Sequence, residues 1–111
     1  MLGLMVETEH AIARVEEIMR VPGVSFVLIG PSDLMIDVKA HGHDASHHEK
    51  LVVQVAEASR RTGIPAGYVT RSKEEARKRV DQGFRFINYR SDNGALIGAL
   101  RQSLADSKEW S

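Results

Sequence analysis

The feature that most constrains the fold is a regular alternation of short apolar runs with longer amphipathic segments. Turn-forming residues bound each run, which is typical of strands buried in a parallel sheet. The segments between them repeat apolar residues every three or four positions, as amphipathic helices do. The expected strands are Gly3–Val6, Val24–Ile29, Ile64–Val69 and Phe84–Tyr89.

Capping residues indicate where the helices between these strands begin and end. Ser46 and Glu49 have the spacing of a capping box, and Gly63 suits the position after the end of that helix. Ser72 and Glu75 form a second capping box. The first expected helix has its apolar stripe at Ala11, Val15, Ile18 and Met19 and ends at Pro22–Gly23. The others are Ser46–Thr62, Ser72–Gly83 and Asp92–Ser107, and the one long loop is Met35–Ala45.

Four strand–helix units in succession predict an α/β fold with a parallel sheet and right-handed crossovers. The 111 residues, 42% of them apolar, suit a single domain that covers 1–111. A closed barrel of such units needs eight of them, in about 250 residues. Four units can instead form an open sheet with helices on both faces, or half of a barrel. Half a barrel exposes two strand edges and a concave face, and therefore favours oligomerisation.

Composition excludes several classes of function. Fifteen basic and fifteen acidic side chains give a net charge of zero, which argues against nucleic acid or an anionic membrane as a partner. There is no cysteine, so disulfides and thiolate chemistry are excluded. No apolar run is long enough to cross a bilayer, and the first residues do not resemble a signal peptide. We therefore expect a soluble, cytoplasmic protein.

Two acidic residues follow neighbouring strands of the expected sheet. Glu7 ends the first strand, and Asp33 follows the second in the stretch LIGPSDL. The carboxyl ends of adjacent parallel strands lie on one rim, so the two carboxylates should approach each other and share a divalent cation such as Mg²⁺ or Mn²⁺. The turn at Gly30–Ser32 would offer backbone N–H groups to a substrate carboxylate. The alternative is that both acids only stabilise helix N-termini.

Longer stretches of the sequence match a family pattern. The segment GLMVETEHAIARVEEIMRVPGVSFVLIGPSDL contains a strand that ends in Glu-Thr, then a helix, then a strand that ends in Ile-Gly-Pro-x-Asp-Leu. The segments TGIPAGYVTRSKEEARKRVDQGFRFI and SDNGALIGAL continue the similarity almost to the end of the chain. The sequence closely resembles the HpcH/HpaI aldolases, which are pyruvate-dependent class II aldolases related to the citrate lyase β-subunit.

The resemblance implies a (βα)4 half of a TIM (β/α)8 barrel. It implies that Glu7 and Asp33 bind the divalent metal, Mg²⁺ or Mn²⁺ with Co²⁺ as a further candidate, and that the N–H groups of Ser32 and Asp33 bind the carboxylate of pyruvate. The implied reaction is cleavage of a 4-hydroxy-2-oxo acid to pyruvate and an aldehyde, with the metal stabilising the pyruvate enolate as a Lewis acid. Members of the family usually form multimers in which the last helix packs on a neighbouring subunit, so the expected partners are these substrates and further copies of the chain.

The sequence also departs from the family pattern. The resemblance begins at the fifth strand of the barrel, so the His and Arg that the family uses for proton transfer and for polarising the keto group are absent from this chain. Met5 stands where the family often has Gln, and Arg90 where it usually has Gly. No catalytic residue can therefore be assigned, and a catalytically incomplete half-barrel that serves as a scaffold is the alternative function.

Two further groups of residues contain side chains that can bind metals or anions. The histidines of HGHDASHHE have a spacing that suits Zn²⁺ or Ni²⁺, although a solvated loop and helix start explains them more simply. The basic residues of RSKEEARKR alternate with acids and are expected on a solvated helix face. The members of the two groups are His41, His43, His47 and His48, and Arg71, Lys73, Arg77, Lys78 and Arg79.

Overall fold

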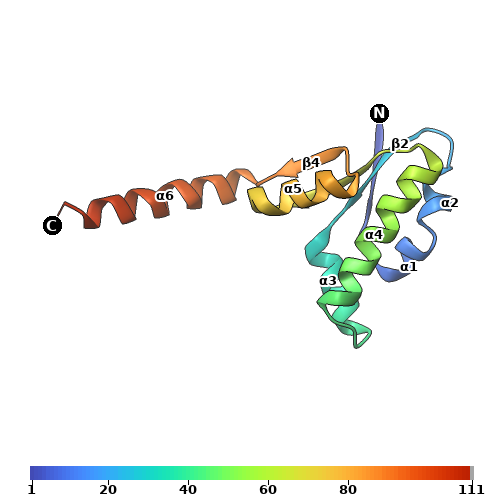
Figure 1. The fold of residues 1–111 in the computed structure, drawn as a ribbon, viewed down its shortest axis with the longest axis horizontal. Helices are drawn as coiled ribbons and strands as arrows, with labels where there is room; N and C mark the ends of the chain where they lie inside the picture. Colours follow the sequence, from blue (N-terminus) through green and yellow to red (C-terminus); the bar gives the residue numbers. More distant parts are fainter. Residues whose placement is uncertain (111) are drawn as a thin grey trace.

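Four strands alternate with six helices in the computed structural model, which describes residues 1–110 (Figure 1). None of the helices in that part of the chain combines the length and the hydrophobicity that a membrane-spanning helix needs. In chain order the elements are β1 (Leu2–Val6), α1 (Glu9–Ala13), α2 (Val15–Met19), β2 (Val24–Ile29), α3 (Pro31–Ala40), α4 (Ala45–Thr62), β3 (Ala66–Thr70), α5 (Lys73–Gln82), β4 (Phe86–Tyr89) and α6 (Asp92–Lys108).

The four strands form one parallel sheet in the order β1-β2-β3-β4. Each strand pairs with its neighbour in the sequence, as in a barrel, whereas a doubly wound open sheet reverses its strand order at a switch point. The expected strands and their parallel arrangement are therefore confirmed. The sheet has two unpaired edges within the described residues, one at β1 and one at β4.

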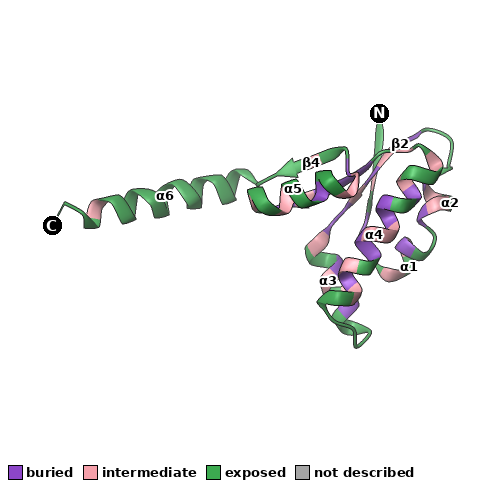
Figure 2. Ribbon diagram, viewed as in Figure 1, coloured by how far each residue is buried: buried purple, intermediate pink, exposed green. Residues whose placement is uncertain are grey.

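The two faces of the sheet differ in burial. One register row places Val6, Ile29, Tyr68 and Ile87 side by side, and these residues belong to the core or pack against it. Helical residues such as Ile12 and Val55 complete that core. The helices therefore cover this face of the sheet. Figure 2 shows the buried residues of the helices and strands in purple.

The opposite face carries apolar residues that no helix of the described chain covers. The adjacent register row is Met5, Leu28, Gly67 and Phe86, in which Met5 is 54% and Phe86 43% exposed. Phe86 stacks on Phe26 with ring centroids 4.9 Å apart. In a closed barrel of this topology, this is the face that points inward. The sheet therefore has the covered outer face and bare inner face of a barrel segment.

The last helix stands apart from the rest of the molecule. None of the residues of α6 is buried, and the helix extends away from the sheet to give the chain an extent of 59 Å along its longest axis (Figures 1 and 2). The expected helix is confirmed. Its apolar side chains, which include Leu96, Leu100 and Leu104, are exposed to solvent.

The expected loop at Met35–Ala45 is wrong, because most of it is helical. Helix α3 begins at Pro31, continues to Ala40, and buries Leu34 and Val38, which lie one turn apart. Proline suits the first helical position because its missing N–H group has no intrahelical partner there. The start signal therefore lies in the sequence, at a proline that also suits the turn expected at Gly30–Ser32.

Two further helix boundaries differ from expectation. The first expected helix is divided at Arg14, whose φ of −111° and ψ of 17° are not helical, into α1 and α2. The N-cap of α4 is Asp44, whose carboxylate accepts the N–H groups of Ser46 and His47, so the proposed capping box at Ser46 is wrong. The expected cap at Ser72 is confirmed, since its hydroxyl accepts the N–H of Glu75.

Candidate metal and carboxylate site

Glu7 lies beside the start of α3, at the rim of the bare face of the sheet. It follows β1, on the same side of the strand as Met5 by the alternation of side chains. Its carboxylate is held against Gly30, because a Cβ atom on Gly30 would come within 2.5 Å of Glu7 Oε2 and 3.1 Å of Met5 Sδ. Glycine at position 30 therefore makes room for the Glu7 carboxylate.

Asp33 lies in the first turn of the helix that starts at Gly30. Gly30 is the N-cap of α3 and has no side chain to accept a hydrogen bond from the first turn, unlike Thr8, Asp44, Ser72 and Ser91 in their helices. The first-turn N–H groups of Ser32 and Asp33 therefore remain free of a side-chain cap. The end of a helix that carries such groups attracts anions, including carboxylates.

Neither carboxylate has a cationic partner. Within residues 1–110, no hydrogen bond or ion pair reaches the side chain of Glu7 or Asp33, whereas Glu16, Glu17 and Glu49 all bind arginine. Two acids near one helix terminus without a counter-charge form an oxygen donor set that suits a hard divalent cation. Glu7 and Asp33 thus offer the oxygen donor atoms that the metal implied by the family resemblance prefers.

Arg71 is a residue of this rim that sequence reasoning missed. It follows β3, and its guanidinium donates a 2.7 Å hydrogen bond to the hydroxyl of Ser32. It also borders a cavity of about 490 Å³ between α3, β3 and the start of α5, together with Ser32, Met35 and Glu75. A cation here lies beside the predicted carboxylate site. Its position immediately after β3 is the signal for this role, although the basic stretch that follows makes a solvated helix face an equally simple expectation.

His48 contacts the first turn of α3 through a hydrogen bond to its backbone. It is buried, and its Nε2 lies 3.2 Å from the carbonyl oxygen of Pro31, to which the ring donates a hydrogen bond. Burial lowers the pKa of His48, and the nearby charge of Arg79 lowers it further against the opposing effect of the Pro31 hydrogen bond. The expectation that the histidines are solvated is therefore wrong for His48, which connects α4 to the start of α3.

The other three histidines of this group, His41, His43 and His47, lie between the end of α3 and the first turn of α4. His47 Nε2 lies 3.3 Å from Glu9 Oε2, and its ring stacks on that of His43 at a centroid distance of 4.1 Å. His41 Nδ1 lies 2.8 Å from the carbonyl oxygen of Asp37, and this hydrogen bond, followed by the Asp37 charge, raises the pKa of His41. Within residues 1–110, their hydrogen bonds and ring contacts involve Asp37, Glu9 and one another, and not Glu7 or Gly30.

Arg79 is buried rather than solvated, contrary to expectation. Its guanidinium donates two hydrogen bonds to the Glu49 carboxylate, at 2.7 and 2.9 Å, and one to the Tyr68 hydroxyl at 3.2 Å. It also stacks over the Tyr68 ring, 4.3 Å from its centroid. This network joins α4 to α5 and β3. Glu49, proposed as a capping residue, is therefore the main acceptor for a buried cation.

The two departures from the family pattern have structural counterparts. Met5 lies on the bare face beside Glu7, with its sulfur near Gly30. Arg90 has a φ of 65°, the one positive φ of a non-glycine residue within the described chain. This left-handed conformation favours glycine, which is the residue that the family usually has there.

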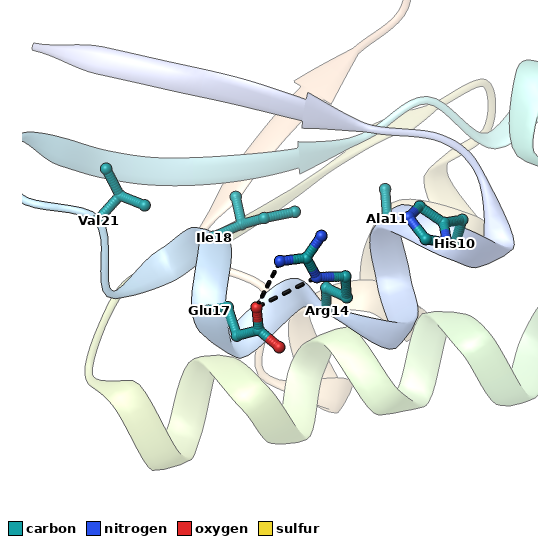
Figure 3. Close-up of a pocket in the computed structure, with 6 residues that line it drawn as sticks. All are labelled: His10, Ala11, Arg14, Glu17, Ile18 and Val21. Carbon is teal, nitrogen blue, oxygen red and sulfur yellow. Dashed lines mark hydrogen bonds and ion pairs between the residues drawn. The ribbon is translucent and has the colours of Figure 1, made fainter.

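A second cavity lies away from the rim. It has a volume of about 520 Å³ and lies along α1 and α2, where the side chains of Ala11, Ile18 and Val21 line it (Figure 3). The ion pair between Arg14 and Glu17, at 2.8 Å, borders it. This mostly apolar groove has no cluster of convergent polar groups, so we do not assign chemistry to it.

Comparison with known proteins agrees with the fold and the motifs. A model of the HpcH/HpaI aldolase/citrate lyase family matches residues 1–99. A hydroxypyruvate/pyruvate aldolase from Rhizorhabdus wittichii is 34% identical over 94% of the chain, and a 5-keto-4-deoxy-D-glucarate aldolase from Enterobacter sp. is 32% identical over 94%. The chain spans 43% and 41% of the length of these two relatives.

A solved structure gives the same result. An HpcH/HpaI aldolase/citrate lyase family protein from Burkholderia cenocepacia J2315 superposes with a TM-score of 0.88 at 27% identity, over 96% of this chain and 42% of that one. The four parallel strands thus correspond to part of the barrel of that family. The motifs, the fold and the family match lead to one conclusion: the chain belongs to the HpcH/HpaI aldolase/citrate lyase family.

Proposed function

We propose that this chain provides the metal- and pyruvate-binding part of an aldolase that cleaves 4-hydroxy-2-oxo acids. Glu7 and Asp33 hold a divalent cation, Mg²⁺ or Mn²⁺, and the N–H groups of Ser32 and Asp33 hold the substrate carboxylate. The observation that carries the proposal is the position of the Glu7 carboxylate over Gly30, at the uncapped start of the helix that contains Asp33. The aldolase names of the relatives are consistent with the reaction.

Each side chain of the rim has a separate role in the proposed site. When bound, the cation supplies a Lewis acid for the 2-oxo group of the substrate. The N-terminus of α3 orients the substrate through its carboxylate. Arg71 holds the Ser32 hydroxyl at 2.7 Å and adds positive charge next to that carboxylate. The bare apolar face next to Met5 keeps water away when a further layer of protein covers it.

A second copy of the chain is the proposed way of covering that face. Unpaired edges at β1 and β4 present free backbone groups, and Met5 and Phe86 expose apolar surface between them. Such edges tend to pair with other strands. We expect dimers or larger species in light scattering at micromolar concentration. A stable monomer at that concentration would contradict this part of the proposal.

Calorimetric titration with Mn²⁺ and oxalate, a mimic of the pyruvate enolate, tests the binding site. We expect the parent chain to bind oxalate only with Mn²⁺ present, and both Glu7→Gln and Asp33→Asn to weaken Mn²⁺ binding by at least about tenfold. Glu17→Gln, which changes an exposed acid of α2, serves as the matched control. Equal Mn²⁺ affinity in the parent and both site variants would exclude this site.

The second candidate function is a half-barrel that serves only as a scaffold. It is favoured by Met5, an apolar side chain whose sulfur lies beside the Glu7 carboxylate at Gly30. Turnover separates the two functions. Release of pyruvate from a 4-hydroxy-2-oxo acid by the purified chain with added Mn²⁺ would exclude the scaffold. Metal binding without turnover would support it.

A further inference from the structure

We propose that Glu9, His43 and His47 form a second metal site, which is selective for Zn²⁺ or Ni²⁺ and separate from the site at Glu7 and Asp33. One ligand atom from each of the three side chains lies within 4.8 Å of the other two. The residues come from three segments: Glu9 begins α1, His47 lies in the first turn of α4, and His43 lies in the connection before it. The fold therefore brings together donors that the sequence separates.

The ligand atoms of these three side chains need to move little to form a zinc site. Zinc bonds of about 2.0–2.1 Å in a tetrahedral site place neighbouring ligand atoms roughly 3.4 Å apart. The separation between His47 Nε2 and Glu9 Oε2 is already 3.3 Å. The His43 ring lies parallel to the His47 ring within 19°, and its centroid is 4.1 Å away. Small rotations of exposed His43 would complete three ligands and leave a fourth position for water.

Glu9 provides a second, independent observation. Its Oε1 atom is buried and has no hydrogen-bond partner within residues 1–110. A buried carboxylate oxygen without a partner is unfavourable, and a cation bound by both oxygens of the Glu9 carboxylate would satisfy it. The backbone N–H of Glu9 donates a 2.7 Å hydrogen bond to Asp37 Oδ2, which fixes the start of α1 against α3. Asp37 thus positions the ligand without being needed as one.

The donor types determine the metal. Two imidazoles and one carboxylate suit Zn²⁺ and Ni²⁺, whereas Mg²⁺ prefers oxygen ligands only. The Glu7 and Asp33 pair offers only carboxylate oxygens and therefore favours Mg²⁺ or Mn²⁺. Glu7 faces the bare side of the sheet beside Gly30, while Glu9 contacts α3 and α4 in the helical layer. A bound Zn²⁺ would tie α1 to α4 beside the rim.

Titration of the full chain with Zn²⁺ alone tests this inference, after treatment with a chelator. The reference is the double variant Glu7→Gln/Asp33→Asn, which we expect to bind one equivalent of Zn²⁺. In that background, His43→Gln and His47→Gln should each weaken binding at least tenfold, and His10→Gln should not. Bound Co²⁺ should show visible absorption of a four-coordinate site that both His variants lose.

The outcomes separate this inference from the proposed function. Loss of Zn²⁺ binding in Glu7→Gln/Asp33→Asn would overturn the second site and leave the first intact. Unchanged affinity in both His43→Gln and His47→Gln would overturn it as well. Because His43 is exposed, its variant is expected to keep the parent's circular dichroism, so the test stands even if His47→Gln does not fold. Failure of Mn²⁺ and oxalate to bind the parent would bear only on the proposed function.

Discussion

Replacing Glu49 by Gln should reduce stability at neutral pH by an amount that vanishes in acid. Glu49 accepts hydrogen bonds from Arg79, Lys78 and Gln82, at 2.7 to 2.9 Å. Burial by itself raises the pKa of Glu49, but these hydrogen bonds and the charge of Arg79 outweigh it and lower the pKa from 4.5 to about 2. The ionised carboxylate of Glu49 is therefore much more stable, relative to its protonated form, in the folded state than in the unfolded state.

The size of the effect follows from that difference in pKa. Linkage converts it to an upper limit of about 3 kcal/mol in the free energy of unfolding. The Glu49 side chain is 32% exposed, so solvent screening reduces the expected contribution to roughly 1.5–2 kcal/mol. Because the folded-state pKa is the lower one, this stability is present above pH 4.5 and is lost as the pH falls toward 2.

Urea unfolding followed by circular dichroism at 222 nm measures this effect, at pH 7, 5, 4 and 3 and at one chain concentration. We expect Glu49→Gln to lose about 2 kcal/mol at pH 7 and less than half of that at pH 3. Glu57→Gln is the matched control, because Glu57 lies on the same helix and its ion pair with Arg61 is exposed, at 3.8 Å. That change should cost about 0.3 kcal/mol.

Two results would refute the reasoning about Glu49. Equal losses at pH 7 in Glu49→Gln and Glu57→Gln would mean that the contact with buried Arg79 contributes no more than a surface ion pair. A loss in Glu49→Gln that persists unchanged at pH 3 would mean that it arises from packing and not from the charge. In either case, the Arg79 network would not be the electrostatic link between α4 and α5 that the distances indicate.

Three further changes test the rim. Gly30→Ala should weaken Mn²⁺ binding at least about tenfold, since the new Cβ would come within 2.5 Å of Glu7 Oε2; unchanged calorimetric affinity would contradict the placement of Glu7. Arg90→Gly should raise the free energy of urea unfolding by about 0.5–1 kcal/mol, because the φ of 65° is unfavourable for a residue with a Cβ. Arg90→Ala keeps the strain and should show no such gain. Arg71→Met should weaken oxalate binding to the Mn²⁺ form by about three- to tenfold, with Arg77→Met unchanged; equal affinities would remove Arg71 from the carboxylate site.

Much of the secondary structure could be predicted from local patterns. The apolar runs identified all four strands to within about two residues, and Gly63 and Gly83 marked two helix ends correctly, with φ values of 74° and 106°. These signals are local, because the backbone conformation of a glycine or a proline depends on its own covalent structure. Pro31 is also such a signal, but it suits a short turn at Gly30–Ser32 as well as the start of a helix. Local pattern alone therefore did not predict α3.

The partners of charged side chains were beyond the reach of sequence patterns. Arg71 and Arg79 lie in one basic stretch, yet the first contacts Ser32 across the rim and the second is buried against Glu49 and Tyr68. Side-chain burial depends on which elements pack together, and those elements are distant in the chain. The same holds for Glu9, which meets His47 only because α1 and α4 lie side by side.

The sequence by itself determined the alternation of strands and helices, the family, and the two acids that follow neighbouring strands. Those properties arise from periodicity and from residues a few positions apart. Only the tertiary structure decided the strand order, the bare face of the sheet, and the positions of Glu7 over Gly30 and Glu9 beside the histidines. These depend on contacts between segments that are far apart in the chain, and the free energy of packing, rather than local conformational preference, selects such contacts.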